Sequence, residues 1–463
     1  MKKIACLLFL FGTLNVYSQT TSSSLNAAYT KFISDPAFKH ASISLYVINN
    51  TKDKIIVDQN SQIGLAPASS LKVVTSAAAY ALLGRNFKYN TTLSYNGKIE
   101  NGILNGDIII TGSGDPTLGS WRYISSNEKN VVAEFMKAIS QQGINEITGN
   151  VLVNESLWTG EITPNGWIWQ DIGNYYGAGA RTLNWRENQY DLLLKSGNEL
   201  NSAVEISGTI PEFVAGLNLK PVASAAAKGS GDNAYIYRPL NESYGFIRGT
   251  IPSGEKSFKI SGAMPNGAEQ LAITLEAALK KSTPQNIEKG YPAGKKGTAG
   301  TIFHTHSSPS LDSISYWFLN KSINLYGESL LKTMGFQEAQ SGETSSGVTV
   351  VKNFWKKMGI ESDALNVQDG SGLSPGNRVT TASLVQVLQY AKKQDWFTSY
   401  LEGFPVINGL KMKSGTINGA LSYTGFIKSK SGEEYTFAFI INNYNGSASE
   451  TRRKMWKLLD LLK

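Results

Sequence analysis

The sequence of 463 residues contains one cysteine and three histidines. The cysteine, Cys6, lies within an apolar stretch, Ile4 to Leu14, that follows Lys2 and Lys3. This arrangement is typical of a secretory signal peptide, which we expect to occupy residues 1–18. Without it the chain has no thiol, which excludes disulfides, cysteine catalysis and thiolate metal sites. No run of roughly 20 apolar residues follows, so we expect no transmembrane segment.

The formal net charge is +8, yet Lys and Arg are scattered along the chain. This pattern favours a solvated basic surface over a nucleic-acid interface, and we expect no nucleic acid as a partner. His304 and His306 alternate in one short segment and would point to the same side of a strand. Two ligands do not make a metal site, and no third is evident, so we expect neither metal nor cofactor.

The order of predicted elements indicates an α/β protein interrupted by a long β-rich insertion. Residues 41–60 read as two strands around a turn, and a helix is expected over 69–83, ended by Gly84. Short strand-like runs separated by Gly and Asn turns then continue to a helix near 268–287. Helices and strands alternate again near the C-terminus. We therefore predict that residues 19–88 and 297–463 form one domain and that 89–296 form one or two inserted domains.

The last helix carries Met455, Leu458, Leu459 and Leu462 at helical spacing. Such a stripe is typical of a helix that packs on a sheet. A helix that lies on a membrane surface is the second interpretation.

The segment "PASSLK" holds the first candidate catalytic group. Ser-x-x-Lys occurs four times in this chain, and only Ser69 opens a predicted helix. There the backbone N–H groups favour developing negative charge, and Lys72 lies one turn away on the same face. A nucleophile with a neighbouring base requires this arrangement. Ser70 has Val73 three residues later and therefore no base. The ordinary alternative for Ser69 is a helix N-cap.

Two further motifs follow in a fixed order. Ser322-x-Asn324 comes directly after a helix-like segment, and Lys413-Ser-Gly comes from an alternating strand. Each motif has chance matches elsewhere in the chain. The set of Ser-x-x-Lys, Ser-x-Asn and Lys-Ser/Thr-Gly is the signature of active-site-serine penicillin-recognising enzymes.

The match extends beyond these motifs to "NLYGESLLKTMG", "DGSGLS" and "KSGTINGALSYTGFI". Together they resemble the D-alanyl-D-alanine carboxypeptidase/endopeptidase family, the low-molecular-mass class C penicillin-binding proteins. The resemblance covers nearly the whole chain after the signal. It implies a transpeptidase-like domain, with an antiparallel sheet flanked by helices and a helical subdomain, and a long inserted region. It also implies export to the periplasm or cell-wall space, with loose membrane association left open.

The resemblance implies that Ser69 attacks the penultimate D-alanine carbonyl of a peptidoglycan stem. Lys72 would take the serine proton, since burial beside a second cation such as Lys413 favours the neutral amine. Ser322 would pass a proton to the leaving amine. Water would then hydrolyse the acyl-enzyme, whereas β-lactams would leave Ser69 acylated.

The resemblance also implies how the substrate is held. Asn324 would bind the substrate amide, and Lys413, with the hydroxyls of Ser414 and Thr416, would attract the terminal carboxylate. The backbone at Gly415 and Thr416 comes close to the ligand, and the N–H groups of Ser69 and Thr416 would stabilise the oxyanion.

One acidic residue of the insertion is a further candidate. In the family such a residue faces the free amine of the dibasic stem residue, and Asp171 in "WIWQD" matches by local motif. A surface or capping aspartate explains Asp171 equally well. Two departures concern neighbours of the motifs: Ile323 stands where the family has Asp or Asn, and Ser414 where it has Thr. They bear on rate and specificity.

Two other functions remain as alternatives. A class A β-lactamase needs a glutamate within Glu-x-x-Leu-Asn, and every Leu-Asn of this chain lacks it. The other alternative is a non-catalytic module that binds cell wall or senses β-lactams. The complete set of serines, lysines and asparagine argues against a decayed site.

Overall fold

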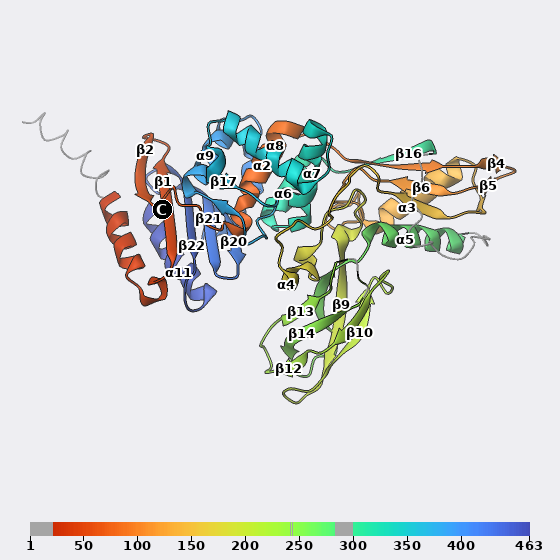
Figure 1. Ribbon diagram of the computed structural model, residues 1–463, viewed down its shortest axis with the longest axis horizontal. Helices are drawn as coiled ribbons and strands as arrows, with labels where there is room; N and C mark the ends of the chain where they lie inside the picture. Colours follow the sequence, from red (N-terminus) through yellow and green to blue (C-terminus); the bar gives the residue numbers. More distant parts are fainter. Residues whose placement is uncertain (1–21, 241, 243, 283–299) are drawn as a thin grey trace, which may run out of the picture. The chain divides into compact units, whose positions relative to one another are not determined.

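The computed structural model describes residues 22–240, 242, 244–282 and 300–463. The predicted signal peptide, Cys6 and the predicted limit at 296/297 lie outside them. The chain divides into two compact units (Figure 1). The first unit comprises residues up to Ala81, Ser315–Ser322 and Val351–Lys463, and the second comprises Leu82–Ile314 and Ile323–Val350. The domain limits predicted from the sequence stay predictions. Within the described residues, none of the helices combines the length and apolarity that a membrane span needs.

The first unit is built on a six-stranded antiparallel sheet in the order β19-β20-β21-β22-β1-β2. The two strands predicted at residues 41–60 form its β1–β2 edge. Their bounds are β1 Ser42–Asn49, β2 Lys54–Gln59, β19 Val406–Ile407, β20 Leu410–Ile417, β21 Ala420–Lys428 and β22 Glu434–Asn442.

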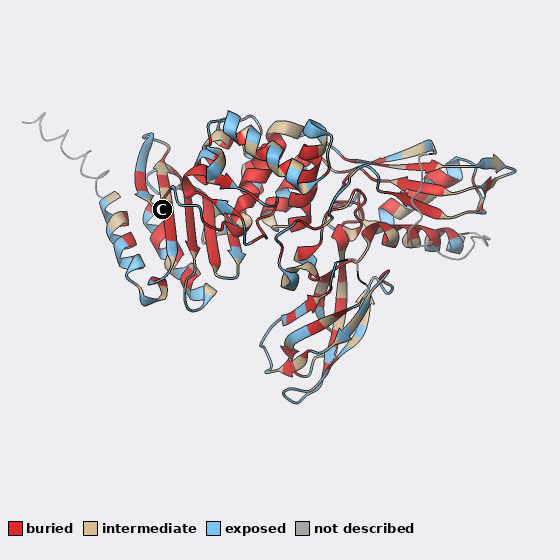
Figure 2. Ribbon diagram, viewed as in Figure 1, coloured by how far each residue is buried: buried red, intermediate tan, exposed pale blue. Residues whose placement is uncertain are grey.

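Both faces of this sheet are covered by helices, so its central strands are largely buried (Figure 2). On β22, Phe437, Phe439 and Ile441 share one face, because side chains alternate along a strand. That face packs on the helical residues 22–33 and on α11 (Ala448–Leu459). Met455, Leu458, Leu459 and Leu462 belong to the same core, so the prediction that the last helix packs on the sheet is confirmed.

The opposite face is covered by α9 (Thr381–Lys392). Ser44 and Thr381 hydroxyls lie 2.6 Å apart across this contact. The predicted helix over 69–83 begins as a short 3-10 turn, Ala68–Leu71, and continues as α2 (Lys72–Leu83). Gly84 follows with a φ of 79°, as expected for a residue that ends a helix. The remaining elements of this part of the chain are α10 Phe397–Glu402, β17 Leu365–Asn366 and β18 Arg378–Val379.

The second unit has two hydrophobic cores. The first lies between helices α3 and α5 and the sheet β16-β3-β6-β8, in which β6 and β8 are parallel. Their bounds are α3 Glu128–Gln141, α5 Gly267–Ser282, β3 Asn90–Tyr95, β6 Ile108–Thr111, β8 Val151–Asn154 and β16 Thr301–Ser307. A small sheet adjoins them, formed by β4 Lys98–Glu100, β5 Ile103–Asn105 and β7 Glu146–Ile147.

The second core lies between a three-stranded and a four-stranded sheet. The first has the order β10-β9-β15, with β9 Gln189–Ser196, β10 Val204–Ile210 and β15 Phe258–Ala263. The second is centred on β14 and contains β11 Asn218–Pro221, β12 Ser224–Ala226, β13 Asn233–Tyr237 and β14 Tyr244–Pro252. Further helices are α4 Trp169–Ile172 and α7 Asn324–Ala339 in this unit, and α6 Leu311–Asn320 and α8 Thr344–Lys357, whose residues are divided between the two units. The predicted α/β fold with a long β-rich insertion is confirmed.

Candidate active site

Ser69 lies in the 3-10 turn that opens α2, and the backbone before it is strained. Ala68 has a φ of 46°, a conformation that residues other than glycine rarely adopt. The Cβ that a residue at 372 would carry meets the carbonyl of Ala68 at 1.9 Å, so only glycine fits there. Strain of this kind persists only where the surrounding structure holds it, and it concentrates at functional sites.

Ser70, the neighbouring serine, is fully buried and engaged. Its hydroxyl lies 2.7 Å from that of Ser422 on β21. Ser422 in turn donates to the carbonyl of Pro67. These bonds attach the turn to the sheet and engage the Ser70 hydroxyl within the protein.

Lys72 is fully buried, and its Nζ lies 2.9 Å from Ser69 Oγ. The same nitrogen donates to the carbonyl of Ser371 over 2.7 Å, and it lies 5.8 Å from the centre of the Phe318 ring. A lysine is costly to bury, because removal from water penalises the charged amine. Its surroundings therefore hold the nitrogen against the serine hydroxyl.

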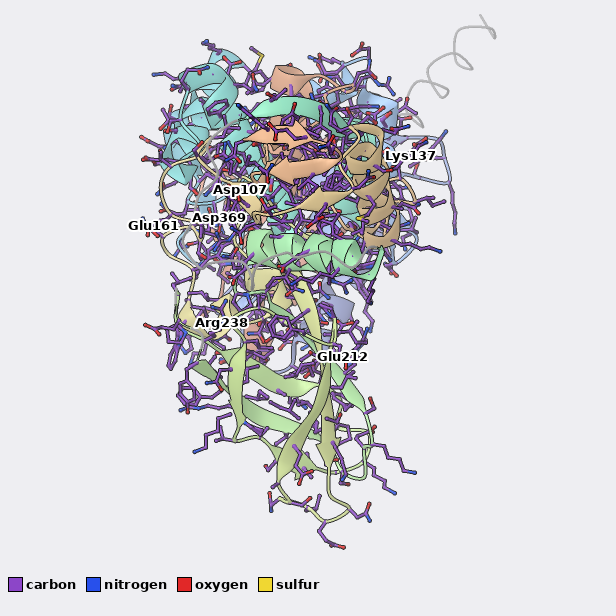
Figure 3. The ribbon with its side chains drawn as sticks, turned by 90° about the vertical axis from the view of Figure 1, so that its right-hand side faces the viewer. Asp107, Lys137, Glu161, Glu212, Arg238 and Asp369 are labelled. Atoms are coloured by element: carbon purple, nitrogen blue, oxygen red, sulfur yellow. The ribbon has the colours of Figure 1, made fainter. Side chains whose placement is uncertain are left out.

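The carbonyl of Ser371 is held by the turn "DGSGLS". Asp369, which Figure 3 labels, is fully buried. Its carboxylate accepts from the backbone N–H groups of Gly372 and Ser374 at 2.7 and 2.6 Å. Thr75 on α2 donates to the carbonyl of Gly370 over 2.7 Å. Asp369 thus binds the backbone of this turn, and the turn places the carbonyl of Ser371 against Lys72.

A second buried lysine lies on β20. Lys413 is 2% exposed, and burial lowers its pKa to about 7. Its Nζ donates to Ser322 Oγ over 3.0 Å and to the carbonyl of Ser414 over 2.9 Å. Ser322 has a φ of 59°, and this strained conformation follows the end of α6. The structure therefore brings together Ser322 and Lys413, which lie 91 residues apart.

Gly415 is the point at which β20 approaches the nucleophile. A Cβ built on it would lie 2.8 Å from the backbone nitrogen of Ser69, 2.4 Å from the carbonyl of Pro67 and 2.3 Å from Ser422 Oγ. Any side chain here would push the strand from the turn. Thr416, the next residue, is exposed, and its hydroxyl accepts from Arg452 over 3.1 Å.

Asn324 and Asp171 both belong to the second unit, where one tyrosine connects them. Asn324, the first residue of α7, donates from Nδ2 to the carbonyl of Tyr176 over 2.7 Å. The side chain of Tyr176 forms a hydrogen bond with Asp171 of α4. Burial raises the pKa of Asp171 to about 6, and the hydrogen bond from Tyr176 opposes that shift. Tyr176 was not singled out from the sequence, although it lies five residues after Asp171.

The start of α7 is also fixed by a buried network. Tyr326 donates to Glu187 over 2.8 Å, and Glu187 also accepts from Ser120 at 2.7 Å and from Arg122 at 2.8 Å. Glu187 is 3% exposed and has a φ of 56°. Because its charge is paired and hydrogen-bonded, the carboxylate holds the turn of α7 that begins with Asn324.

His304 and His306 do point to the same side of β16, as predicted. His304 Nε2 and His306 Nδ1 lie 2.7 and 2.9 Å from the two carboxylate oxygens of Glu134 on α3. In the part of the chain that the structure describes, no group of three or more His, Cys, Asp or Glu is arranged to hold a metal ion.

Ser69 lies beside buried Lys72, and Ser322 lies beside buried Lys413 of β20. These two serine–lysine pairs are typical of a serine peptidase of the penicillin-recognising fold. Residues 25–461 match the model of the D-Ala-D-Ala carboxypeptidase 3 (S13) family, and the chain belongs to that family. The resemblance read from the motifs is confirmed, and the chain is a serine-type carboxypeptidase by family.

Several known proteins are similar over almost the whole length. The chain is 26% identical to D-alanyl-D-alanine carboxypeptidase DacB of Haemophilus influenzae, over 88% of this chain and 86% of that protein. It is 23% identical to the D-alanyl-D-alanine carboxypeptidase of Actinomadura sp. (strain R39), over 90% and 80%. The crystal structure of penicillin-binding protein 4 (dacB) from Haemophilus influenzae matches with a TM-score of 0.78 and 23% identity, over 96% and 99% of the two chains. This match shows the fold.

Proposed function

We propose that the protein is an exported DD-peptidase that hydrolyses the D-Ala-D-Ala end of peptidoglycan stems through an acyl-enzyme on Ser69. The observation that carries this proposal is the 2.9 Å separation of Lys72 Nζ and Ser69 Oγ in a buried setting. A serine hydroxyl is a poor nucleophile until a neighbouring base takes its proton. Neutral Lys72 is that base, and the proton moves from Ser69 Oγ to Lys72 Nζ as the oxygen attacks the carbonyl carbon.

The remaining groups act on the substrate. The backbone N–H groups of Ser69 and Thr416 stabilise the oxyanion of the tetrahedral intermediate, and Ser322, bonded to Lys413, delivers a proton to the leaving D-alanine. Protonated Lys413 attracts the terminal carboxylate, with the Ser414 and Thr416 hydroxyls beside it. Water then attacks the acyl-enzyme, and Ser69 is regenerated.

Asn324 and Asp171 recognise the rest of the stem. Asn324 binds the substrate amide through its side chain. The carboxylate of Asp171 is ionised above pH 6 and pairs with the free amine of a dibasic stem residue. Recognition of this amine also favours a second activity, the cleavage of peptide cross-links. In that reaction the leaving group is a second peptide stem.

β-Lactams are expected to act as acylating inhibitors of Ser69. A structure of the Haemophilus influenzae relative has been solved in complex with a β-lactam. For the localisation, the Lys2-Lys3 start and the apolar stretch after it support export to the periplasm or cell-wall space.

The deciding experiment measures D-alanine released from a pentapeptide that ends in D-Ala-D-Ala. Ser69→Ala should lose release by at least roughly 10⁴-fold, since the acyl-enzyme cannot form. Ser253→Ala, which removes the serine of another Ser-x-x-Lys pattern, is the matched control and should keep full activity. Release that survives in Ser69→Ala would disprove the mechanism. Covalent labelling by fluorescent penicillin without release of D-alanine would favour the alternative of a β-lactam sensor. Sustained hydrolysis of nitrocefin would favour the alternative of a β-lactamase.

A further inference from the structure

A buried arginine of the second unit has no acidic partner among the described residues. Arg238, labelled in Figure 3, directly follows β13 and is 6% exposed. Its Nη1 donates to the carbonyl of Glu242 over 3.0 Å, but its buried Nε meets no acceptor in the described residues. No carboxylate there lies within 4.0 Å of it. A buried charge without a partner is strongly unfavourable, and arginine stays charged when buried.

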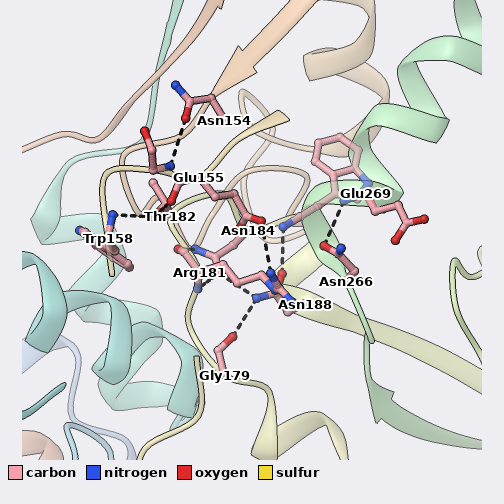
Figure 4. Close-up of polar contacts among 12 residues, drawn as sticks. Asn154, Glu155, Trp158, Gly179, Arg181, Thr182, Asn184, Asn188, Asn266 and Glu269 are labelled. Atoms are coloured by element: carbon pink, nitrogen blue, oxygen red, sulfur yellow. Dashed lines mark hydrogen bonds and ion pairs between the residues drawn. The ribbon is translucent and has the colours of Figure 1, made fainter. Parts of the chain in front are cut away.

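Arg238 lines a small cavity together with a second arginine. The cavity has a volume of about 50 Å³. Its wall includes Arg181 and Asn188, and Figure 4 shows how these are fixed. The backbone N–H of Arg181 donates to Asn184 Oδ1 over 2.9 Å, and Asn188 Nδ2 donates to the same oxygen over 2.8 Å. Asn184 therefore holds the backbone of Arg181 and the side chain of Asn188 in this wall.

The cavity is electropositive. The Arg181 guanidinium has one ion pair, with Glu155 at 3.2 Å, whereas Arg238 has none among the described residues. Burial lowers the pKa of Arg238, and the charge of Arg181 adds to that effect. Glu161 also lines the cavity, but it is an exposed residue and makes no ion pair with either arginine. Tyr190 interacts electrostatically with Arg238. Its buried hydroxyl also lacks a hydrogen-bond partner in the described structure.

We propose that Arg238 and Arg181 form an anion-binding site for one carboxylate-sized group. A cavity of about 50 Å³ has room for a group as small as a carboxylate. Guanidinium matches carboxylate in geometry, because its N–H groups form parallel bonds to the two oxygens. The Nη1 atom is already used on Glu242, whereas the enclosed Nε has an N–H group without an acceptor among the described residues.

The anion has two possible sources, a carboxylate of the peptide stem or a free small anion. Ile172 and Gly177, which also line the cavity, belong to the segment that carries Asp171 and Tyr176. A stem bound there would have its own carboxylates near this cavity. The choice between the two sources rests on the proposed function, whereas the anion site itself does not.

The test uses ¹⁹F NMR of difluoroacetate with the full protein, at constant ionic strength. The resonance should broaden with wild-type protein and sharpen when acetate is added. Arg238→Gln should weaken binding roughly tenfold or more, because charge-assisted hydrogen bonds are lost. Arg248→Gln is the matched control, since Arg248 is an exposed arginine of the neighbouring strand β14 that stacks on Tyr237 and Phe246. It should bind the probe as the wild type does.

Two further measurements separate the outcomes. Lys413→Gln should keep the binding, which excludes the carboxylate-attracting lysine of β20 as the group that binds the probe. If Arg238→Gln does not fold, the ¹⁵N resonance of the Arg238 Nε–H in the wild type should shift as acetate is titrated. Equal binding by folded Arg238→Gln, or a wild type that neither broadens the probe nor shifts this resonance, would overturn the proposal.

The source follows from competition. A soluble stem peptide that displaces difluoroacetate at least tenfold more effectively than acetate, and loses this ability when its side carboxylate is amidated, identifies the stem. Displacement by acetate and phosphate alone identifies a free anion. Both results support the anion-binding site. Neither measurement depends on peptidase activity, so both remain valid if the proposed function is wrong.

Discussion

The close approach of β20 to the nucleophile makes Gly415 the sharpest test of the site. In Gly415→Ala, the new methyl group would lie 2.8 Å from the Ser69 nitrogen and 2.4 Å from the Pro67 carbonyl. Real Cβ atoms do not approach so closely, and both of these atoms belong to the backbone. The strand or the turn must therefore move by several tenths of an ångström.

The movement has two measurable consequences. Overpacking of a filled interior lowers the free energy of unfolding by about 1–3 kcal/mol. A shift between β20 and the turn also misaligns the N–H groups of Ser69 and Thr416. Loss of one oxyanion donor reduces kcat by about 10²–10³, so we expect acylation to slow by that factor while the protein remains folded.

The assay is the rate of covalent labelling by fluorescent penicillin, measured beside the Tm of the same sample. Gly64→Ala is the control within the same unit, because its Cβ would meet only the Cβ of Arg378, at an ordinary 3.5 Å. Its labelling rate and Tm should be close to those of the wild type. If Gly415→Ala is acylated at the wild-type rate, the inference that this strand and Ser69 jointly form the oxyanion site is wrong.

Two predictions concern charge. Burial lowers the pKa of Lys413 to about 7, so the lysine loses its positive charge as the pH rises. We therefore expect kcat/KM for a substrate that ends in a carboxylate to fall about fivefold from pH 7 to pH 8. Lys413→Arg should remove this fall, since arginine stays charged; an unchanged profile would contradict the role. Asp171→Asn should lower kcat/KM roughly tenfold for a stem with a free side-chain amine and leave its acetylated analogue unaffected. Because burial raises the pKa of Asp171 to about 6, the preference for the free amine should weaken below that pH.

The sequence predicts those parts of the site that depend on local spacing. Ser69 and Lys72 are three residues apart at a helix start, and the helix places Nζ against Oγ. The apolar stripe of the last helix likewise specifies its face, because a helix repeats every 3.6 residues. The Gly and Asn turns between short strand-like runs likewise predict the β-rich character of the insertion. Each of these depends on near neighbours in the chain.

Other features depend on contacts that no local pattern contains. The carbonyl of Ser371 meets Lys72 across 299 residues, and Tyr326 meets Glu187 across 139. A backbone carbonyl has no sequence signature, and a buried glutamate in a left-handed turn has no characteristic spacing from its partners. Arg238 was unremarkable in the sequence, because burial without a counter-ion is visible only once the sheets around it are formed.

The pairing of β1 with β22 determines when the site can exist. Ser42 pairs with Asn442, so strands from the two ends of the chain lie side by side in the sheet that presents Lys413 (Figure 1). Closing so long a loop is slow, and β1 lacks this partner until β22 has been made. During synthesis, a chain that has not reached β20 to β22 therefore carries Ser69 without these strand neighbours. We expect Ser69 to stay unreactive until these strands have joined the sheet.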